Sequence, residues 1–143
     1  MTTQPTRVLF LCTGNSCRSQ MAEGFARDMH GDWLDPYSAG VEKHGLNPMA
    51  VAVMEEIGVD VSSQTSKTLD ELPRSDFDIV ITVCGNAHDR CPHYGGGTRV
   101  LHVAFDDPAR ASGSRSEILA EFRWVRDAIK AFMADFEGFV ERS

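Results

Sequence analysis

Short apolar runs alternate with amphipathic segments along the chain. Continuous apolar or β-branched runs occupy residues 7–11, 78–83 and 99–105, and a shorter candidate strand covers residues 33–38. Continuous runs of this length are typical of strands covered on both faces. Between them, apolar residues recur every three or four positions, which indicates helices that bury one face. The pattern therefore predicts four strands separated by helices.

Capping residues mark where the helices begin and end. The signals are an N-cap asparagine followed by proline, a C-terminal glycine and two Ser/Thr-x-x-Glu capping boxes. They lie at Asn47-Pro48, Gly58, Thr68–Glu71 and Ser114–Glu117. Together with the apolar spacing, they predict helices over residues 17–30, 48–57 and 68–71, and a long helix from 114 whose apolar stripe continues to Phe136.

Strands that alternate with helices predict an α/β fold, a parallel sheet with helices on both faces. The chain shows no repeat or linker, so we expect a single domain over residues 1–143. Such folds bind ligands beyond the carboxyl ends of the strands. Cys12, Cys84 and Asp107 each come just after a predicted strand. We therefore expect these three side chains to meet at one edge of the sheet.

Composition and charge narrow the class of protein. The chain of 143 residues has a net charge of −7, which weighs against nucleic acid and anionic membranes as partners. No apolar run is long enough to span a membrane, and the polar start of the chain does not resemble a signal peptide. We therefore expect a cytoplasmic protein, a monomer by default. In that reducing compartment, its four cysteines point to catalysis, metal binding or inert burial.

The loop after the first strand has the features of an oxyanion site with a nucleophile. Cys12 is followed by five residues and then by Arg18 and Ser19. The backbone N–H groups of the loop can converge on an anion at a helix N-terminus. They belong to Thr13, Gly14, Asn15, Ser16 and Cys17. Arg18 can grip two oxygens at once. We expect a lowered pKa for Cys12, with Ser19 donating a hydrogen bond to its sulfur.

The residues of this loop resemble a known catalytic loop. Val8 to Arg18 is similar to the loop of low-molecular-weight protein tyrosine phosphatases, and the longer stretch resembles more closely the thioredoxin-coupled arsenate reductases of that superfamily. The resemblance rests on Leu11–Gly24, Tyr37–Gly40, His44–Pro48, Val83-Cys84, Cys91-Pro92 and Phe105–Ala109. It implies a three-layer sandwich around a four-stranded parallel sheet of order 2-1-3-4.

The resemblance also implies a relay of three thiols. Cys12 attacks arsenate while Asp107 protonates the leaving oxygen. Cys84 then attacks Cys12 and releases arsenite, and Cys91 moves the disulfide to Cys84–Cys91, which thioredoxin reduces. In the implied fold the first and third strands are neighbours, about 4.8 Å apart, so Cys84 is within reach of Cys12 after a modest movement of the loop. No cofactor is expected, because the thiols supply both electrons.

Three other functions compete with this interpretation. A phosphatase would use Cys12, Arg18 and Asp107 but leave Cys84 and Cys91 idle. Related phosphatases usually place aromatic residues after Asp-Pro, whereas Ala109-Arg110 follows here. A thiol or arsenic sensor would bind without turnover. The same reductase could also use glutaredoxin or a small thiol as its electron donor.

Metal binding offers an alternative role for some of these residues. Zinc could take Cys84, His88, Cys91 and His93, but six residues separate the cysteines where structural zinc sites usually have two to four. We therefore expect no metal site. The remaining candidates are expected to have packing or surface roles: Cys17, His30, His44, His102, Trp33 and Trp124.

Some of the related reductases have a potassium site near the catalytic loop. Asn15, Glu23, Ser38 and Thr65 match its ligand positions, but Lys67 stands where those members have an aspartate. A lysine ammonium would repel the ion and could take its place. We therefore expect no potassium requirement.

Overall fold

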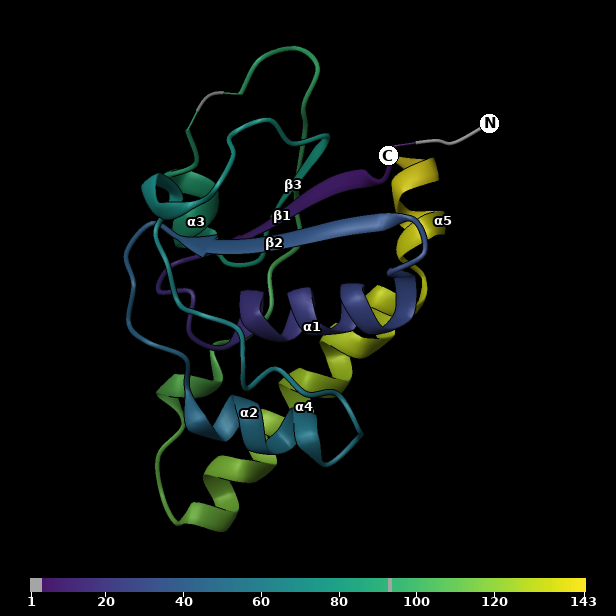
Figure 1. The fold of residues 1–143 in the computed structure, drawn as a ribbon. Helices are drawn as coiled ribbons and strands as arrows, with labels where there is room; N and C mark the ends of the chain where they lie inside the picture. Colours follow the sequence, from purple (N-terminus) through teal and green to yellow (C-terminus); the bar gives the residue numbers. More distant parts are fainter. Residues whose placement is uncertain (1–3, 93) are drawn as a thin grey trace.

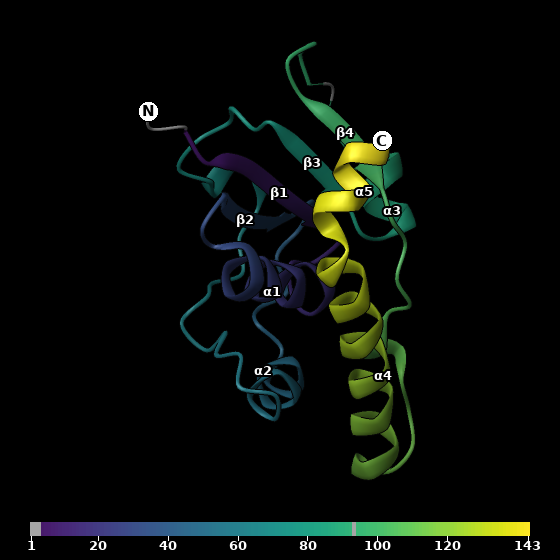
Figure 2. The ribbon, with the colours of Figure 1, turned by 90° about the vertical axis from the view of Figure 1, so that its right-hand side faces the viewer.

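The computed structural model describes residues 4–92 and 94–143, and its centre is a four-stranded parallel sheet. The strands are β1 (Thr6–Cys12), β2 (Leu34–Gly40), β3 (Ile79–Thr82) and β4 (Arg99–His102). Their order is β2-β1-β3-β4, which confirms the predicted order. Leu11 lies opposite Ala39 on one side and Thr82 on the other. The carboxyl end of β1 therefore lies between β2 and β3, and Figures 1 and 2 show β1 between these two strands.

Helices pack in a layer beside this sheet (Figure 1). α1 (Arg18–His30) contacts β1 and β2, and α4 (Arg115–Ala134) contacts both α1 and α2 (Pro48–Glu55). The short α3 (Gly85–Asp89) follows β3, and α5 (Phe136–Arg142) ends the chain. Two single-turn helices, η1 (Leu69–Glu71) and η2 (Pro108–Arg110), lie in the connections. Within the described part of the chain, no helix is long and apolar enough to cross a membrane.

The apolar pattern places the core where we expected it. Val8 to Leu11 are all inaccessible to solvent, so both faces of β1 are covered. From the helices, Met21 and Phe25 of α1 and Phe122 and Ile129 of α4 are buried with them. The core thus fixes β1 firmly, and the loop that leaves its carboxyl end starts from a rigid position.

The caps behave as the sequence predicted. The Asn47 side chain accepts a hydrogen bond from the Met49 N–H at 2.8 Å, and Ser114 forms a capping box with Glu117 at the start of α4. Gly58 has a φ of +79°, a left-handed conformation that glycine adopts without strain. These local signals fix the ends of the helices that surround the site.

Three expectations differ from the structure. The long helix stops at Ala134, because Asp135 leaves the helical region at φ −103° and ψ 17°, and α5 then starts at Phe136. The spacing of the apolar residues does not reveal this break, because Phe136 remains in the core with its ring centroid 6.1 Å from that of Phe10. The fourth strand ends at His102 and not at residue 105. Trp33 packs against the core as expected, but Trp124 is 60% exposed and is not a packing residue.

A buried arginine joins α2 to α4. Arg126 is 8% exposed and donates hydrogen bonds to the Val53 carbonyl at 2.9 Å and to Glu56 Oε1 at 2.8 Å. Arg123, one turn earlier and largely exposed, contacts the other oxygen of Glu56 at 2.7 Å. Arg126 therefore satisfies a helix-end carbonyl that Arg123 does not reach.

We expect Arg126→Met to lower the free energy of unfolding by about 2 kcal/mol, because it leaves the buried Val53 carbonyl without a donor. Urea denaturation measures this loss. The matched control is Arg123→Met, which should cost clearly less because an exposed ion pair contributes little. Equal losses in the two variants would show that the carbonyl contact does not matter.

Candidate active site

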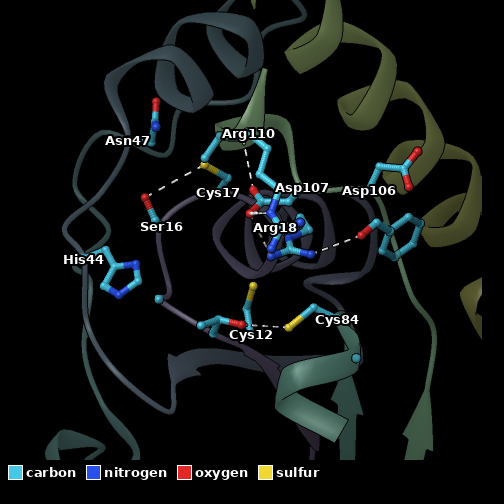
Figure 3. Close-up of a pocket in the computed structure, with 15 residues that line it drawn as sticks. Cys12, Ser16, Cys17, Arg18, His44, Asn47, Cys84, Asp106, Asp107 and Arg110 are labelled. Carbon is cyan, nitrogen blue, oxygen red and sulfur yellow. Dashed lines mark hydrogen bonds and ion pairs between the residues drawn. The ribbon is translucent and has the colours of Figure 1, made fainter. Parts of the chain in front are cut away.

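One cavity of about 990 Å³ lies at the carboxyl edge of the sheet, and Figure 3 shows the side chains that face it. Its floor contains Cys12 from the end of β1 and Cys84 from the end of β3, and Asp107 comes from the segment after β4. The predicted meeting of these three side chains is therefore confirmed. Thr13, Gly14, Ser16, Cys17 and Arg18 of the loop also line the cavity.

Close backbone contacts hold the loop in shape. Asn15 has a φ of +48°, a left-handed conformation that asparagine tolerates better than most residues. Gly40 at the end of β2 lies so near that an added Cβ would be 2.8 Å from the Asn15 nitrogen and from the Thr13 oxygen. Only glycine lets the two backbones come this close. The loop is thus braced from the side of β2.

A buried hydrogen-bond network supports the loop from behind. The Asn15 side-chain amide donates to Ser19 Oγ at 2.8 Å and to Ser38 Oγ at 3.0 Å, and Ser38 donates to Glu23 Oε1 at 2.5 Å. Gln20 donates to the Asn15 carbonyl oxygen at 3.0 Å. We expected Ser19 to donate to the sulfur of Cys12. Among the described residues, its hydroxyl instead has Asn15 as hydrogen-bond partner, because the left-handed Asn15 folds back over the start of α1.

The Arg18 side chain is positioned to bind an anion. Its side chain is 10% exposed, Nη1 donates to the Phe105 carbonyl at 3.1 Å, and Nη2 lies 3.6 Å from Asp107 Oδ2. Its Nε is buried and, among the described residues, has no hydrogen-bond partner. A buried donor without a partner costs free energy unless a ligand satisfies it. An oxyanion in the cavity would supply that acceptor.

Asp107 has a defined place beside Arg18. It caps η2 by accepting a hydrogen bond from the Ala109 N–H at 3.0 Å, and Arg110 Nε lies 3.9 Å from its other oxygen. Its side chain keeps 31% of its surface exposed toward the cavity. The cap fixes the direction of the carboxyl, and the exposed part can meet a bound substrate.

The two cavity thiols influence each other strongly. The pKa of Cys84 is lowered to about 5, chiefly by a hydrogen bond from Cys12 and further by the Thr13 hydroxyl at 3.2 Å and the Ala87 N–H at 3.4 Å. The pKa of Cys12 is raised, first by its contact with Cys84 and then by burial. Our expectation of a lowered pKa at Cys12 is wrong for the free protein. At neutral pH one of the two sulfurs is therefore a thiolate. It is the sulfur of Cys84, because more hydrogen-bond donors point at it.

The other two thiols differ from this pair. Cys17 lines the cavity, but burial raises its pKa to about 11. Its Sγ lies 3.8 Å from Ser16 Oγ. Cys91 is half-buried outside the residues that line the cavity, and burial raises its pKa. Cys17 is therefore poorly suited to act as a nucleophile, and Cys91 stands apart from the pair formed by Cys12 and Cys84.

The zinc alternative involves four residues, of which the structure describes the side chains of Cys84 and Cys91. His93 and the side chain of His88 lie outside what the structure describes. In the remainder, no three His, Cys, Asp or Glu side chains are grouped to hold a metal ion. Cys84 is meanwhile engaged by Cys12 and Thr13, as described above.

Sequence reasoning missed several residues of the cavity wall. His44, Asn47 and Arg110 line it. As expected, His44 has a surface and packing role, because its half-exposed ring covers Gly14 and its Nε2 lies 2.9 Å from Glu42, but its place in the cavity wall was not predicted. The signal available was the run from His44 to Pro48 in the resemblance. Two other histidines also have partners: His30 contacts the Met133 carbonyl at 2.6 Å, and His102 contacts Thr82 at 2.7 Å.

The residues that match the ligand positions of the potassium site lie close together in the structure. Lys67 Nζ donates to the Thr65 carbonyl at 2.6 Å, and its backbone N–H donates to Asn15 Oδ1 at 2.9 Å. Burial lowers the pKa of Lys67, while attraction to Glu23 opposes this effect. The ammonium group thus stands beside the carbonyl and carboxylate that would otherwise attract a cation.

The comparisons agree with the fold and the loop. Residues 7–142 match the family described as low molecular weight phosphotyrosine protein phosphatase, and the chain belongs to that family. A relative from Halalkalibacterium halodurans, an arsenate reductase, is 53% identical over 85% of this chain and 88% of its own.

Two solved structures are similar over most of this chain. An arsenate reductase in the phosphate-binding state has a TM-score of 0.74 and 34% identity, covering 92% of this chain and 95% of its own. A thioredoxin-dependent arsenate reductase from Corynebacterium glutamicum has a TM-score of 0.63 and 26% identity, covering 94% of this chain and 64% of its own.

We expect Cys84 to react with iodoacetamide as a thiolate from neutral pH down to about pH 5, because its pKa is lowered to about 5. Below that pH the thiolate is protonated and the rate falls. Thr13→Val removes a donor and should move the midpoint of this profile upward. Peptide mapping of the alkylated protein measures each cysteine separately. Cys17 serves as the internal control and should stay unreactive at neutral pH; an unchanged midpoint in Thr13→Val would contradict the assigned role of the hydroxyl.

We expect wild-type melting temperature and activity to be the same in potassium and in sodium, because the Lys67 ammonium already stands beside Thr65. Lys67→Asp replaces that ammonium with a carboxylate and should make the melting temperature higher in potassium than in sodium. Thermal unfolding in matched chloride buffers measures both. A wild type that gains stability specifically from potassium would refute this prediction.

Proposed function

We propose that this protein reduces arsenate to arsenite through Cys12, Cys84 and Cys91, with thioredoxin as the electron donor. The observation that carries the proposal is the pair of interacting thiols on the floor of the cavity, below a buried arginine nitrogen that has no hydrogen-bond partner among the described residues. A phosphatase needs one thiol and an anion site. A reductase needs in addition a second thiol that can complete a disulfide with the first.

In the first step the loop binds arsenate and Cys12 attacks it. The Arg18 guanidinium and the loop N–H groups of residues 13–18 bind the anion by donating hydrogen bonds to its oxygens. One of these oxygens becomes the acceptor for Arg18 Nε. The proton of the hydrogen bond between the two thiols can move to Cys84, so that Cys12 carries the negative charge when it attacks. Cys12 forms a sulfur–arsenic bond, and Asp107 protonates the oxygen that leaves as water.

In the second step Cys84 attacks the sulfur of Cys12. A sulfur–sulfur bond forms, the sulfur–arsenic bond breaks, and its electron pair stays on arsenic, which leaves as arsenite. The thiolate is the attacking form, and two donors that lower the pKa of Cys84 remain when Cys12 is bonded to arsenic. Thr13 and the Ala87 N–H stabilise that thiolate before the attack.

In the third step Cys91 attacks Cys84 and frees Cys12. The disulfide then joins Cys84 and Cys91, and thioredoxin reduces it. Added Cβ atoms at Gly95, Gly96 and Gly97 would meet no other atom within 4 Å, so these three glycines face open space. That open space supports a movement of the segment that exposes the disulfide to a protein reductant.

Phosphate ester hydrolysis is expected only as a side activity. The family match and the Cys12–Arg18–Asp107 arrangement favour some hydrolysis. However, Ala109 and Arg110 follow Asp107-Pro108 in the cavity wall, where an aromatic side chain would be needed to hold a phenyl ring. We further propose that the protein works without a cofactor, as a monomer in the cytoplasm.

The test is NADPH oxidation driven by arsenate in the presence of thioredoxin and thioredoxin reductase. Wild type should turn over continuously. Cys12→Ser, Cys84→Ser and Cys91→Ser should each lower the steady rate by at least about a hundredfold, because each removes one bond-making sulfur. Cys17→Ser is the matched control and should retain most activity, since Cys17 takes no part in the relay.

The pattern of failure distinguishes the alternatives. An inactive wild type that hydrolyses an aryl phosphate rapidly through Cys12 would indicate a phosphatase. Turnover with glutathione and glutaredoxin but not with thioredoxin would keep the reductase and change its donor. Continuous turnover of Cys91→Ser with thioredoxin would remove the third thiol from the mechanism.

A further inference from the structure

One carboxylate connects the rim of the cavity with the segment that carries Cys91. Glu42 Oε2 lies 2.9 Å from His44 Nε2, and Glu42 Oε1 lies 3.3 Å from Arg90 Nη1. His44 is part of the cavity wall, and Arg90 directly precedes Cys91. The hydrogen bonds from His44 and Arg90 lower the pKa of Glu42, so its carboxylate is charged at neutral pH.

The rim end of this connection is fixed to the catalytic loop. The backbone N–H groups of Val41, Glu42 and His44 donate to the carbonyls of Cys12, Thr13 and Gly14 at 3.1, 2.9 and 2.9 Å. The His44 ring also lies against Gly14, where an added Cβ would be 2.3 Å from Nδ1. Glu42 is therefore an anchor whose backbone does not move relative to Cys12.

The other end of the connection belongs to a segment that must move. Cys84 precedes α3 and Cys91 follows Arg90. Five of the residues between them form α3, whose rise of about 1.5 Å per residue alone spans about 6 Å from its first to its last Cα atom. A disulfide requires roughly 4.4–6.8 Å. The segment from 84 to 91 must therefore leave its present shape before Cys84 and Cys91 can join.

We propose that Glu42 is a positioning residue that holds Arg90, and with it α3, against the cavity rim while Cys84 reacts with Cys12, and releases Arg90 when Cys91 reaches Cys84. This inference rests on the third step of the proposed relay. The ion pair favours the reduced arrangement of the segment and opposes the Cys84–Cys91 disulfide. Removing it should make that disulfide easier to form.

The test measures the redox equilibrium of Cys84 and Cys91 in a Cys12→Ser background, in glutathione buffers and without arsenate. Glu42→Gln and Arg90→Gln should each increase the disulfide-forming equilibrium constant about two- to fivefold, the scale of an exposed ion pair. This corresponds to a reduction potential about 10 to 20 mV more negative. The double variant should give the same shift as either single variant, because both remove one interaction.

Two controls separate positioning from a general loss of charge. Lys43→Gln breaks the neighbouring exposed pair between Lys43 Nζ and Glu71 Oε2 on the same rim, at 2.7 Å, and should leave the potential unchanged. High salt should remove the shift caused by Glu42→Gln, because exposed charges are screened. In otherwise wild-type protein, hydrogen exchange of residues 85–92 should be faster in Glu42→Gln than in Lys43→Gln.

An unchanged potential in Glu42→Gln, or an equal shift in Lys43→Gln, would overturn this inference. Additive shifts in the double variant would do the same. Because the titration contains no arsenate, its outcome is independent of turnover. A wild type without arsenate reductase activity would remove the proposed function, yet the Glu42 effect on the Cys84–Cys91 equilibrium could still be present or absent.

Discussion

The parallel pairing of β1 with both of its neighbours is the constraint on which the site depends. Because β1 is central and fully covered, its carboxyl end can move very little, and the segments from β2 and β3 are fixed on either side of it. β2 supplies Gly40 and the rim, and β3 supplies Cys84 directly beside Cys12. The chemistry of the cavity is therefore a consequence of strand order, since a different order would separate the two thiols.

The same arrangement divides the site into a rigid part and a movable part. The catalytic loop is held by the Asn15 network, by Gly40 and by the rim. The segment after Cys84 is a short helix, which is held by the buried Ala87, by the contacts of Cys84 and by the exposed ion pair of Arg90. An oxyanion site benefits from rigidity, whereas a disulfide relay requires movement. The fold meets both needs by assigning them to adjacent strands.

How much the sequence revealed depends on how local each feature is. The catalytic loop, the caps and Arg18 were predictable because their residues are neighbours in the chain. The strand order came from the resemblance and not from periodicity. The low pKa of Cys84 could not be predicted, because it arises chiefly from Cys12, which is distant in the chain, and further from the Thr13 hydroxyl and the Ala87 N–H. The break at Asp135 was hidden because Phe136 stays in the apolar stripe.

The two tryptophans have different environments, because Trp33 packs against the core and Trp124 is exposed. Their fluorescence can therefore report on the folding of the protein. The Trp33 ring is 5.6 Å from His30 and 6.2 Å from Phe136, inside the aromatic cluster at the amino edge of the sheet, and its Nε1 donates to His30 Nδ1 at 3.2 Å. Trp124 stands in solvent on α4. Trp33 should therefore emit at shorter wavelength than Trp124. Unfolding should red-shift the first indole and leave the second nearly unchanged, so that replacing Trp124 by Phe would isolate a signal from the core alone.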